Sequence, residues 1–311
     1  MGGRMKSRVS QSAWLAYGLV GLAAGLVVNA LLGPLFTETI RYHYSDSLIN
    51  QGIAVDAVAL AAAAIGLVAA LLVLRGHRAG PILAFIPATF TAYMAPQYIV
   101  GPDYVGLPGN NEQFFLLHLG LLVVAVALIL AAWASVDRDW LGSVPRVSNR
   151  RRSWAMLGVA AFIALGRWLS AVLDLMSGQP SNPDYLENPT AYLLLGILDL
   201  GLVVPAAVTA AIGLRIGARW ARTASYAVIG WFTLVPASVA AMSITMQIND
   251  DPNASNGATV LFIVAGIVFS AGALALYRSL FTRNRAELGG SNEADLEAEA
   301  IDKQLPIALK H

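Results

Sequence analysis

The sequence predicts an all-α, polytopic integral membrane protein with eight transmembrane helices. Two features of its composition predict this: 57% of the 311 residues are hydrophobic, and only 13% are charged. A soluble domain carries about 25% charged residues. The third observation is that nearly all of the charges fall between long apolar segments. About 20 apolar residues cross a hydrocarbon core about 30 Å thick, so each such segment predicts one spanning helix.

The segments follow one another with short polar connections. A basic arm, residues 1–11, precedes a first apolar run that is longer than the core of a signal peptide, so we expect an uncleaved first helix. A polar stretch at 135–153 separates helices one to four (12–134) from helices five to eight (154–280), and a cytoplasmic polar tail occupies 281–311. The predicted spans are residues 12–35, 53–74, 80–100, 114–134, 154–176, 191–214, 226–248 and 259–280.

Proline and glycine predict irregularities in this pattern. Pro87, Pro205 and Pro236 fall inside the third, sixth and seventh spans, where the missing N–H is expected to interrupt or kink the helix. In the tail, Gly289 and Gly290 predict a hinge ahead of a short helix.

The two halves of the chain have similar spacing. Trp14 precedes Asp56 by 42 residues, and Trp154 precedes Asp199 by 45. Four helices in each half would make this a parallel repeat about an axis along the membrane normal. Any eight-helix chain with short loops shows comparable spacing, so the sequence leaves open whether the halves are true repeats.

The distribution of basic residues predicts the orientation. Sixteen lysine and arginine residues lie in the N-terminal arm, in the loops after the second, fourth and sixth spans, and after the eighth, whereas the four opposite loops contain only Arg41. Basic residues near helix ends prefer the cytoplasmic side. We therefore expect both termini to be cytoplasmic and the acidic loops to face outward.

Several classes of protein are excluded or disfavoured by what the sequence lacks. The chain has no cysteine, which removes disulfides, thiolate metal sites and thiol nucleophiles. It carries no Ser/His/Asp spacing, H-E-x-x-H motif or phosphate-binding glycine loop. We expect no cofactor, no bound metal and no nucleic-acid partner, and we expect a protein that is not an enzyme. An intramembrane enzyme built from Asp56, Asp199 and His118 is the alternative.

The stretch ALGRWLSAVLDLM (164–176) places an arginine and an aspartate within an apolar span. Arg167 lies nine residues before the outer end of its helix, about 13 Å deep, and Asp199 enters the next, antiparallel helix to about the same depth. A lone charge there costs at least about 2.5–3.5 kcal/mol. We therefore predict that Arg167 pairs with Asp199, either to fix helix packing alone or also to bind a ligand.

The other intramembrane polar residues also belong to the outer half of the bilayer, and the inner halves of the spans are nearly free of them. We expect an outward-open polar cavity with a hydrophobic floor, over which residues 104–115 fold. A channel would place polar groups along its whole path. Two alternatives stay open: His118 acts as an interhelical hydrogen-bond partner rather than a proton carrier, and Asp56 either joins the cavity or reaches water. The candidate site consists of Arg167, Asp199, Asp56, His118, Asn29, Gln97 and Asp174.

The stretch NPTAYLLLGILDLGLVVPA (188–206) and the Ala/Gly/Leu-rich pattern around it carry a resemblance. The whole chain resembles eight-helix integral membrane proteins of bacteria, particularly of actinobacteria, a family without an assigned function. The resemblance implies the topology and a multi-pass location in the bacterial inner (plasma) membrane. It transfers no functional residues.

Taken together, these features predict binding or transport of a small solute or lipid-like molecule through an outward-facing polar pocket. Arg167 would hold an anionic group if its pairing with Asp199 is incomplete. The expected partners are the lipid bilayer and this ligand. The alternative is a non-catalytic accessory subunit of a membrane complex, whose polar cluster only fixes the packing against another membrane protein.

Overall fold

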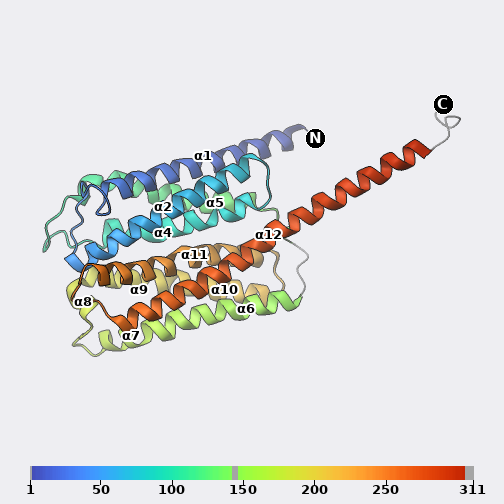
Figure 1. Ribbon diagram of the computed structural model, residues 1–311. Helices are drawn as coiled ribbons and strands as arrows, with labels where there is room; N and C mark the ends of the chain where they lie inside the picture. The colour runs from blue at the N-terminus through green and yellow to red at the C-terminus, as the bar shows by residue number, and fades with distance from the viewer. Residues whose placement is uncertain (1, 142–145, 305–311) are drawn as a thin grey trace.

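The computed structural model describes residues 2–141 and 146–304, and within these residues it contains helices and no strand. The helices lie side by side in one bundle (Figure 1). Their bounds are α1 Gly2–Leu32, α2 Asp46–Leu74, α3 Gly80–Leu83, α4 Phe85–Val100, η1 Asn111–Phe114, α5 Phe115–Ser135, α6 Arg146–Ala161, η2 Phe162–Trp168, α7 Leu169–Met176, α8 Pro183–Glu187, α9 Pro189–Gly196, η3 Ile197–Val203, α10 Val204–Arg215, α11 Arg219–Ile248 and α12 Asn256–Gln304.

Seven helical stretches within the described residues are long and apolar enough to cross a membrane, which agrees with a helical membrane protein. The predicted third span, 80–100, differs because it is divided into α3 and the 16-residue α4. At 1.5 Å per residue, α4 alone is about 24 Å long. The division follows from Pro87, which has no N–H to donate to the carbonyl of Leu83. The count of eight spans therefore stays a prediction.

Helix α2 begins at Asp46, seven residues before the start predicted from the apolar pattern. The hydroxyl of Ser45 accepts a hydrogen bond from the Leu48 N–H at 3.3 Å and so caps the helix. As a result, Asp56 lies ten residues inside α2 rather than at its outer end. The apolar pattern assigns the polar residues before the apolar run to a loop, although they form the first two turns of the helix.

The fifth and sixth spans each contain a π-helical segment, η2 and η3. Pro205 is the second residue after η3 and cannot donate to the carbonyl of Gly201, which accounts for the widened turns before it. Pro236, in contrast, lies inside an unbroken α11, so the helix is not interrupted there, and a kink at Pro236 stays a prediction. No proline accompanies η2, and the sequence gives no signal for it.

Helices α1, α2, α4 and α5 form a closed ring, in which each packs on its two neighbours and α5 returns to α1. Helix α11 joins this ring to the rest of the bundle, because it packs on α2 and α4 as well as on α10 and α12. Alanine residues fill the buried face of α2, among them Ala59, Ala62 and Ala69. Such small side chains allow helices to approach closely in a membrane.

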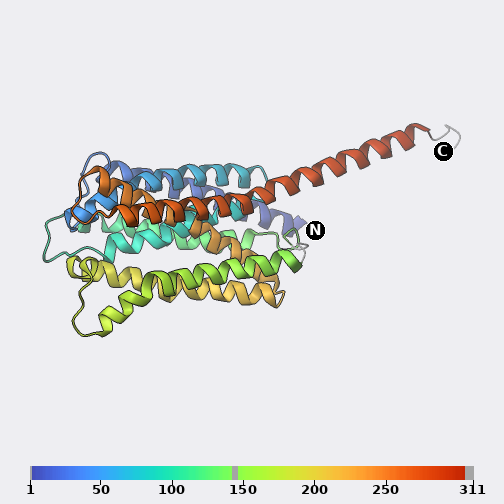
Figure 2. The same ribbon diagram turned by 60° about the horizontal axis from the view of Figure 1, so that its bottom comes forward.

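The second group of helices does not form a comparable ring. Helix α6 packs on α10, α10 on α11, and α11 on α12, but α11 is the only described helix on which α12 packs extensively. The beginning of α1 and the far end of α12 lie at the same end of the bundle (Figures 1 and 2).

The polar ends of the chain differ from the prediction. Helix α12 runs without interruption through Gly289 and Gly290, so the predicted hinge is wrong. The helix leaves the bundle and projects beyond it (Figure 2). Residues 305–311 of the predicted tail lie outside the described residues. Helix α6 begins at Arg146, so the second part of the predicted 135–153 loop is helical.

Candidate functional site

A cavity of about 590 Å³ lies among α2, α4, η2–α7, α9–η3, α11 and α12. Its lining begins with loop residues at the end of the bundle opposite the start of α1, among them Asn182 and Asn253. It ends on three phenylalanines, Phe162, Phe232 and Phe269. Phe269 contacts both of the others, with ring centroids 6.0 Å from Phe162 and 5.4 Å from Phe232. The cavity therefore has a polar rim and an aromatic floor.

Arg167 and Asp199 both line this cavity, and the predicted ion pair between them is present. The Nε atom of Arg167 lies 3.4 Å from Oδ2 of Asp199. The Asp199 side chain is only 5% exposed, whereas that of Arg167 is 39% exposed. The carboxylate is enclosed by protein, and the guanidinium is accessible.

Asp199 has two further donors, which the sequence pattern does not predict. The Tyr93 hydroxyl donates to Oδ1 at 2.8 Å, and the Trp168 indole N–H donates to Oδ2 at 2.7 Å. Both bonds are shorter than the contact with Arg167. Hydrogen bonds to a carboxylate stabilise its charge, so Asp199 does not depend on Arg167 alone.

The π-helical segments position the side chains of Arg167, Trp168 and Asp199. Arg167 and Trp168 are the last two residues of η2, and Asp199 lies in the first turn of η3. Gly196 lies against the Trp168 ring, where an added Cβ atom would be 3.2 Å from the nearest ring carbon. A glycine at this position lets the indole approach α9 closely, which directs its N–H toward Asp199. Single π-helical turns inside α-helices are frequent at functional sites.

Arg167 keeps hydrogen-bonding capacity that the described residues do not use. Its Nε contact with Asp199 and the position of its guanidinium 5.6 Å from the centre of the Trp168 ring are the interactions found for it among residues 2–141 and 146–304. A guanidinium has five N–H donors in a planar fork. The terminal nitrogens of Arg167 can therefore bind an acceptor inside the cavity while Nε remains on Asp199.

Gln97, another predicted site residue, also lines the cavity. Its side-chain amide donates to the Tyr93 carbonyl at 3.0 Å, and its backbone carbonyl accepts from the Tyr44 hydroxyl at 2.6 Å. Gln97 is thus held one helical turn from Tyr93, which itself holds Asp199.

Asn29 and His118 form a second polar cluster that does not line the cavity, so the prediction of one shared cluster is wrong. His118 Nε2 lies 3.0 Å from Oδ1 of Asn29, and the Tyr42 hydroxyl lies 3.4 Å from each of these two atoms. An amide oxygen only accepts, so Nε2 of His118 carries the proton in this arrangement. The cluster crosslinks α1, α5 and the loop before α2, as the interhelical alternative for His118 predicted.

Asp56 also lies apart from the cavity. Its side chain is buried against the turn after α1, where the Leu35 N–H donates to Oδ2 at 3.5 Å, and the residue is 1% exposed. Both predicted roles for Asp56, a second cavity carboxylate or a group that reaches water, are therefore wrong. The seven additional residues at the start of α2 account for the difference, because they carry the chain outward beyond Asp56.

Asp174 holds the loop at the rim of the cavity. Its carboxylate accepts from the Ser181 N–H and hydroxyl and from the Asn182 N–H, at 2.8 to 3.1 Å. Asn182 in turn lines the cavity and donates to the Tyr192 hydroxyl at 3.2 Å. Asp174 therefore shapes the rim without lining the cavity itself.

The predicted cover of the cavity, residues 104–115, lies elsewhere. The backbone of Arg41 and His43 pairs with Asn110 and Asp103, so this segment is held against residues 39–44. His43 also contacts the Leu107 carbonyl and the Glu112 carboxylate. Burial lowers the pKa of the His43 imidazole, but these two acceptors raise it by more, so its pKa lies above 6.5.

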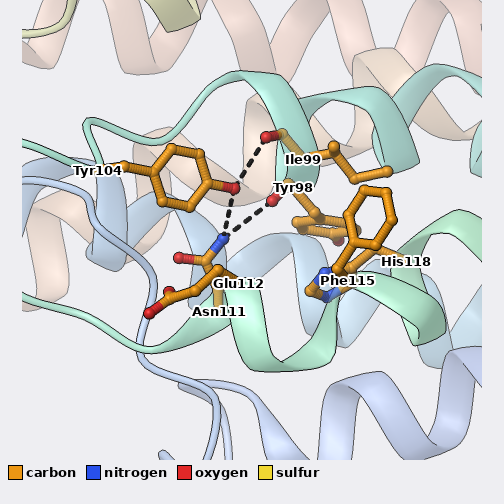
Figure 3. A pocket seen from close by; sticks show the side chains of 7 residues that line it. All are labelled: Tyr98, Ile99, Tyr104, Asn111, Glu112, Phe115 and His118. Carbon is orange, nitrogen blue, oxygen red and sulfur yellow. Dashed lines mark hydrogen bonds between the residues drawn. The ribbon is translucent and has the colours of Figure 1, made fainter.

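A smaller hollow of about 510 Å³ lies beside this segment, between the ends of α4 and α5 (Figure 3). His118 and Phe115 line one side of it and Tyr104 the other. Asn111 donates to the Tyr98 carbonyl at 3.0 Å and to the Tyr104 hydroxyl at 3.2 Å. Asn111 and Tyr104 bond to each other, Glu112 bonds to His43, and His118 bonds to Asn29. These side chains therefore have partners in the protein, in contrast to the terminal nitrogens of Arg167 in the larger cavity.

Among the residues that the structure describes, no group of three or more His, Asp or Glu side chains lies close enough to hold a metal ion. No protein family model, curated protein or solved structure matches the chain. The resemblance to actinobacterial membrane proteins stays a prediction, and the function has to be inferred from the geometry of the cavity.

Proposed function

We propose that this chain is a multi-pass protein of the bacterial inner membrane with eight spans and both termini in the cytoplasm. The third span would be α3 and α4 together. Its break is compatible with a membrane because α2, α5 and α11 surround it, and irregular backbone is tolerated there when protein covers it. An even number of spans agrees with the shared end of the bundle at which α1 begins and α12 leaves (Figure 1).

Within this topology, the cavity would open toward the outer side and bind a small solute or a lipid-like molecule. A single observation carries this proposal: Arg167 faces a cavity of about 590 Å³ with donors to spare, while its partner Asp199 is held by Tyr93 and Trp168. Ligand sites commonly have volumes of about 300–1,000 Å³, apolar walls and a few placed polar groups. Packing alone does not require an accessible guanidinium.

The form of the cavity favours binding, or the outward-open state of a transporter, over a channel. Its lining stops at the phenylalanine floor, and α10 and the second half of α2, toward the opposite end of the bundle, contribute no residue to it. A conducting path would place hydration sites along its whole length. The proposed activity is therefore binding at mid-membrane depth, with any release to the cytoplasm requiring a second conformation.

Mass spectrometry of bound molecules tests this proposal. The protein is extracted from its native membrane in polymer-bounded discs, and molecules released on denaturation are compared among the wild type, Arg167→Gln and Asp199→Asn. Arg41→Gln, in an outer loop, removes the same charge away from the cavity and serves as the control. We expect a molecule that the wild type and the control retain and the two cavity variants lose. Identical profiles from all four folded proteins would contradict the proposal.

A second candidate function is that of an accessory subunit of a membrane complex. The observation that favours it is α12, because only 11% of its most apolar 18-residue window is buried. Its exposed side chains are apolar, including Val260, Ile267 and Leu274. Lipid would cover such a face as well as a partner helix does. Arg167 and Asp199 would then serve packing alone, and no bound molecule would depend on Arg167.

A further inference from the structure

The cavity is exposed along one side only. Every exposed residue that lines it belongs either to residues 162–184 or to residues 253–261, whereas the lining residues from α2, α4, α9, η3 and α11 are buried or half-buried. We call this exposed edge, between η2–α7 and the first turns of α12, the lateral seam. It is marked by Phe162, Gly166 and Ser170 on one side and by Leu261 on the other.

The seam has a cause in the packing of the helices. In the ring of α1, α2, α4 and α5, the fourth helix returns to the first. In the second group, α12 packs extensively only on α11 and does not close against α6 or α7. In the first ring, α5 packs on α1 and so closes the ring. In the second group no described helix makes the corresponding contact between α12 and η2–α7, and the cavity lies at that position.

The seam lies at membrane depth. Gly166 and Arg167 are separated from the outer end of α7 at Met176 by nine to ten residues, or about 13–15 Å along the helix. Leu261 lies on a span whose neighbouring exposed residues are apolar. A molecule that enters here comes from the hydrocarbon region, so it needs an apolar part.

Arg167 lies on the edge of the seam and determines which polar group an entering molecule has to carry. It is both a lining residue and an exposed one, and its contact with the enclosed Asp199 is made through Nε, which leaves the terminal nitrogens for a ligand. Guanidinium binds carboxylate or phosphate through two parallel N–H bonds. The floor residues Phe162 and Phe269 meet across the inner end of the seam and provide an apolar surface beside that cation.

We propose that the cavity takes an amphiphile with one anionic headgroup, a carboxylate or a phosphate, which enters sideways from the membrane through the lateral seam. The headgroup binds the terminal nitrogens of Arg167, and the acyl chain lies in the seam against Phe162 and α12. The inference rests on the proposed function, since it specifies the ligand class and the route for that same cavity.

A set of matched probes tests the ligand class. The protein is placed in discs of neutral phosphatidylcholine, and its thermal midpoint is measured with dodecanoate, dodecanol, acetate or inorganic phosphate. Dodecanol has the same chain without the charge, and the two small anions have the charge without the chain. We expect dodecanoate to raise the midpoint and the other three to leave it unchanged, and Arg167→Gln to weaken the apparent dodecanoate affinity at least tenfold while Arg41→Gln retains it.

Two bulky substitutions test the route. Ala265→Trp fills the α12 side of the cavity at the seam, and Ile267→Trp places the same ring on the exposed surface of that helix, away from the cavity. We expect the first to abolish the effect of dodecanoate and the second to preserve it. Leu261→Trp, at the exposed edge, repeats the test if Ala265→Trp does not fold.

The outcomes separate the two proposals. If acetate or phosphate alone stabilises the protein and Arg167→Gln removes this effect, the cavity binds a soluble anion. That result would agree with the proposed function and overturn the proposal of an amphiphilic ligand. Equal effects of dodecanol and dodecanoate would overturn the anionic headgroup, and an unchanged dodecanoate response in both seam variants would overturn the lateral route. No response to any probe, together with mass-spectrometric profiles that do not depend on Arg167, would overturn the proposed function as well.

Discussion

The indole N–H of Trp168 lies 2.7 Å from Oδ2 of Asp199, closer than the guanidinium of Arg167, which reaches the same oxygen at 3.4 Å. The aspartate of the cavity is therefore held first by neutral donors from two helices. This arrangement lets a membrane-embedded carboxylate keep its partners while an adjacent cation stays accessible.

Removing the carboxylate of Asp199 should destabilise the protein more than neutralising it. Asp199→Ala leaves the Tyr93 hydroxyl, the Trp168 N–H and Arg167 without their acceptor, which should cost about 2–3 kcal/mol. Asp199→Asn keeps an oxygen that accepts from Trp168 and should cost about 1 kcal/mol. Unfolding in mixed micelles with increasing sodium dodecyl sulfate measures both values. Equal losses would show that the buried donors do not depend on this acceptor.

Gly196→Ala should weaken the hydrogen bond between Trp168 and Asp199 without contacting Asp199 itself. The new methyl group would lie 3.2 Å from the Trp168 ring, so the ring has to shift and its hydrogen bond to Asp199 lengthens. We expect a change in indole fluorescence and a loss of about 1 kcal/mol in the free energy of unfolding. Gly257→Ala, which adds a methyl group where no atom lies within 4 Å, is the matched control. A spectrum identical to that of the control would contradict the packing described here.

The second polar cluster should affect stability and leave binding unchanged. Asn29→Ala removes the acceptor of His118 Nε2 and should cost about 1–2 kcal/mol, because a buried donor loses its partner. The response to dodecanoate should stay as in the wild type, since Asn29 and His118 do not line the cavity. Loss of that response in a folded Asn29→Ala protein would mean that the two clusters act together.

The loop pair of His43 and Glu112 should make stability depend on pH. The pKa of His43 is raised above 6.5 in the folded protein, so its contribution to stability is fully present below pH 6.5 and is lost as the pH rises through the folded value. We expect His43→Gln to lower the thermal midpoint more at pH 5.5 than at pH 8.5. Titration of the His43 ring by NMR checks the sign directly. A value below 6.5, or one unchanged in Glu112→Gln, would contradict it.

The predicted topology can be mapped with single cysteines, because the chain contains none. Val105, which is 99% exposed, lies on the predicted outer side, and the exposed Asp139 lies on the predicted inner side. An impermeant maleimide should label Val105→Cys in intact cells and Asp139→Cys only after permeabilisation. The reverse pattern would show that the cavity opens toward the cytoplasm.

Much of this architecture could be predicted from the sequence. In a membrane, a long apolar run forms a spanning helix, and a charged side chain within such a run needs a partner of opposite charge. The pairing of Arg167 with Asp199 followed from matched depth on antiparallel neighbours, since neither charge is stable alone there. The partners Tyr93 and Trp168 could not be found in this way. A tyrosine or tryptophan in a membrane helix has a polar atom that many surroundings can satisfy.

The division of the polar residues into two clusters could not be predicted either. Depth gives the height of a residue in the bilayer but not its direction around the bundle, so Asn29 and Arg167 looked equivalent. The boundary of α2 adds to this, because the apolar pattern places Asp56 near a helix end, whereas the helix begins ten residues earlier. The lateral seam exists because α12 does not pack extensively against α6. This arrangement depends on packing between distant helices, so no short stretch of sequence predicts it.

Fluorescence quenching by 2-bromododecanoate tests the central claim most directly, because the bromine next to the carboxylate quenches tryptophan only at contact range. The Trp168 contribution is the difference between the wild type and Trp168→Phe in discs of neutral lipid. We predict strong quenching of Trp168 that unbrominated dodecanoate reverses and that Arg167→Gln weakens at least tenfold. Quenching that is absent, or that Arg167→Gln leaves unchanged, would contradict an anion site at this arginine.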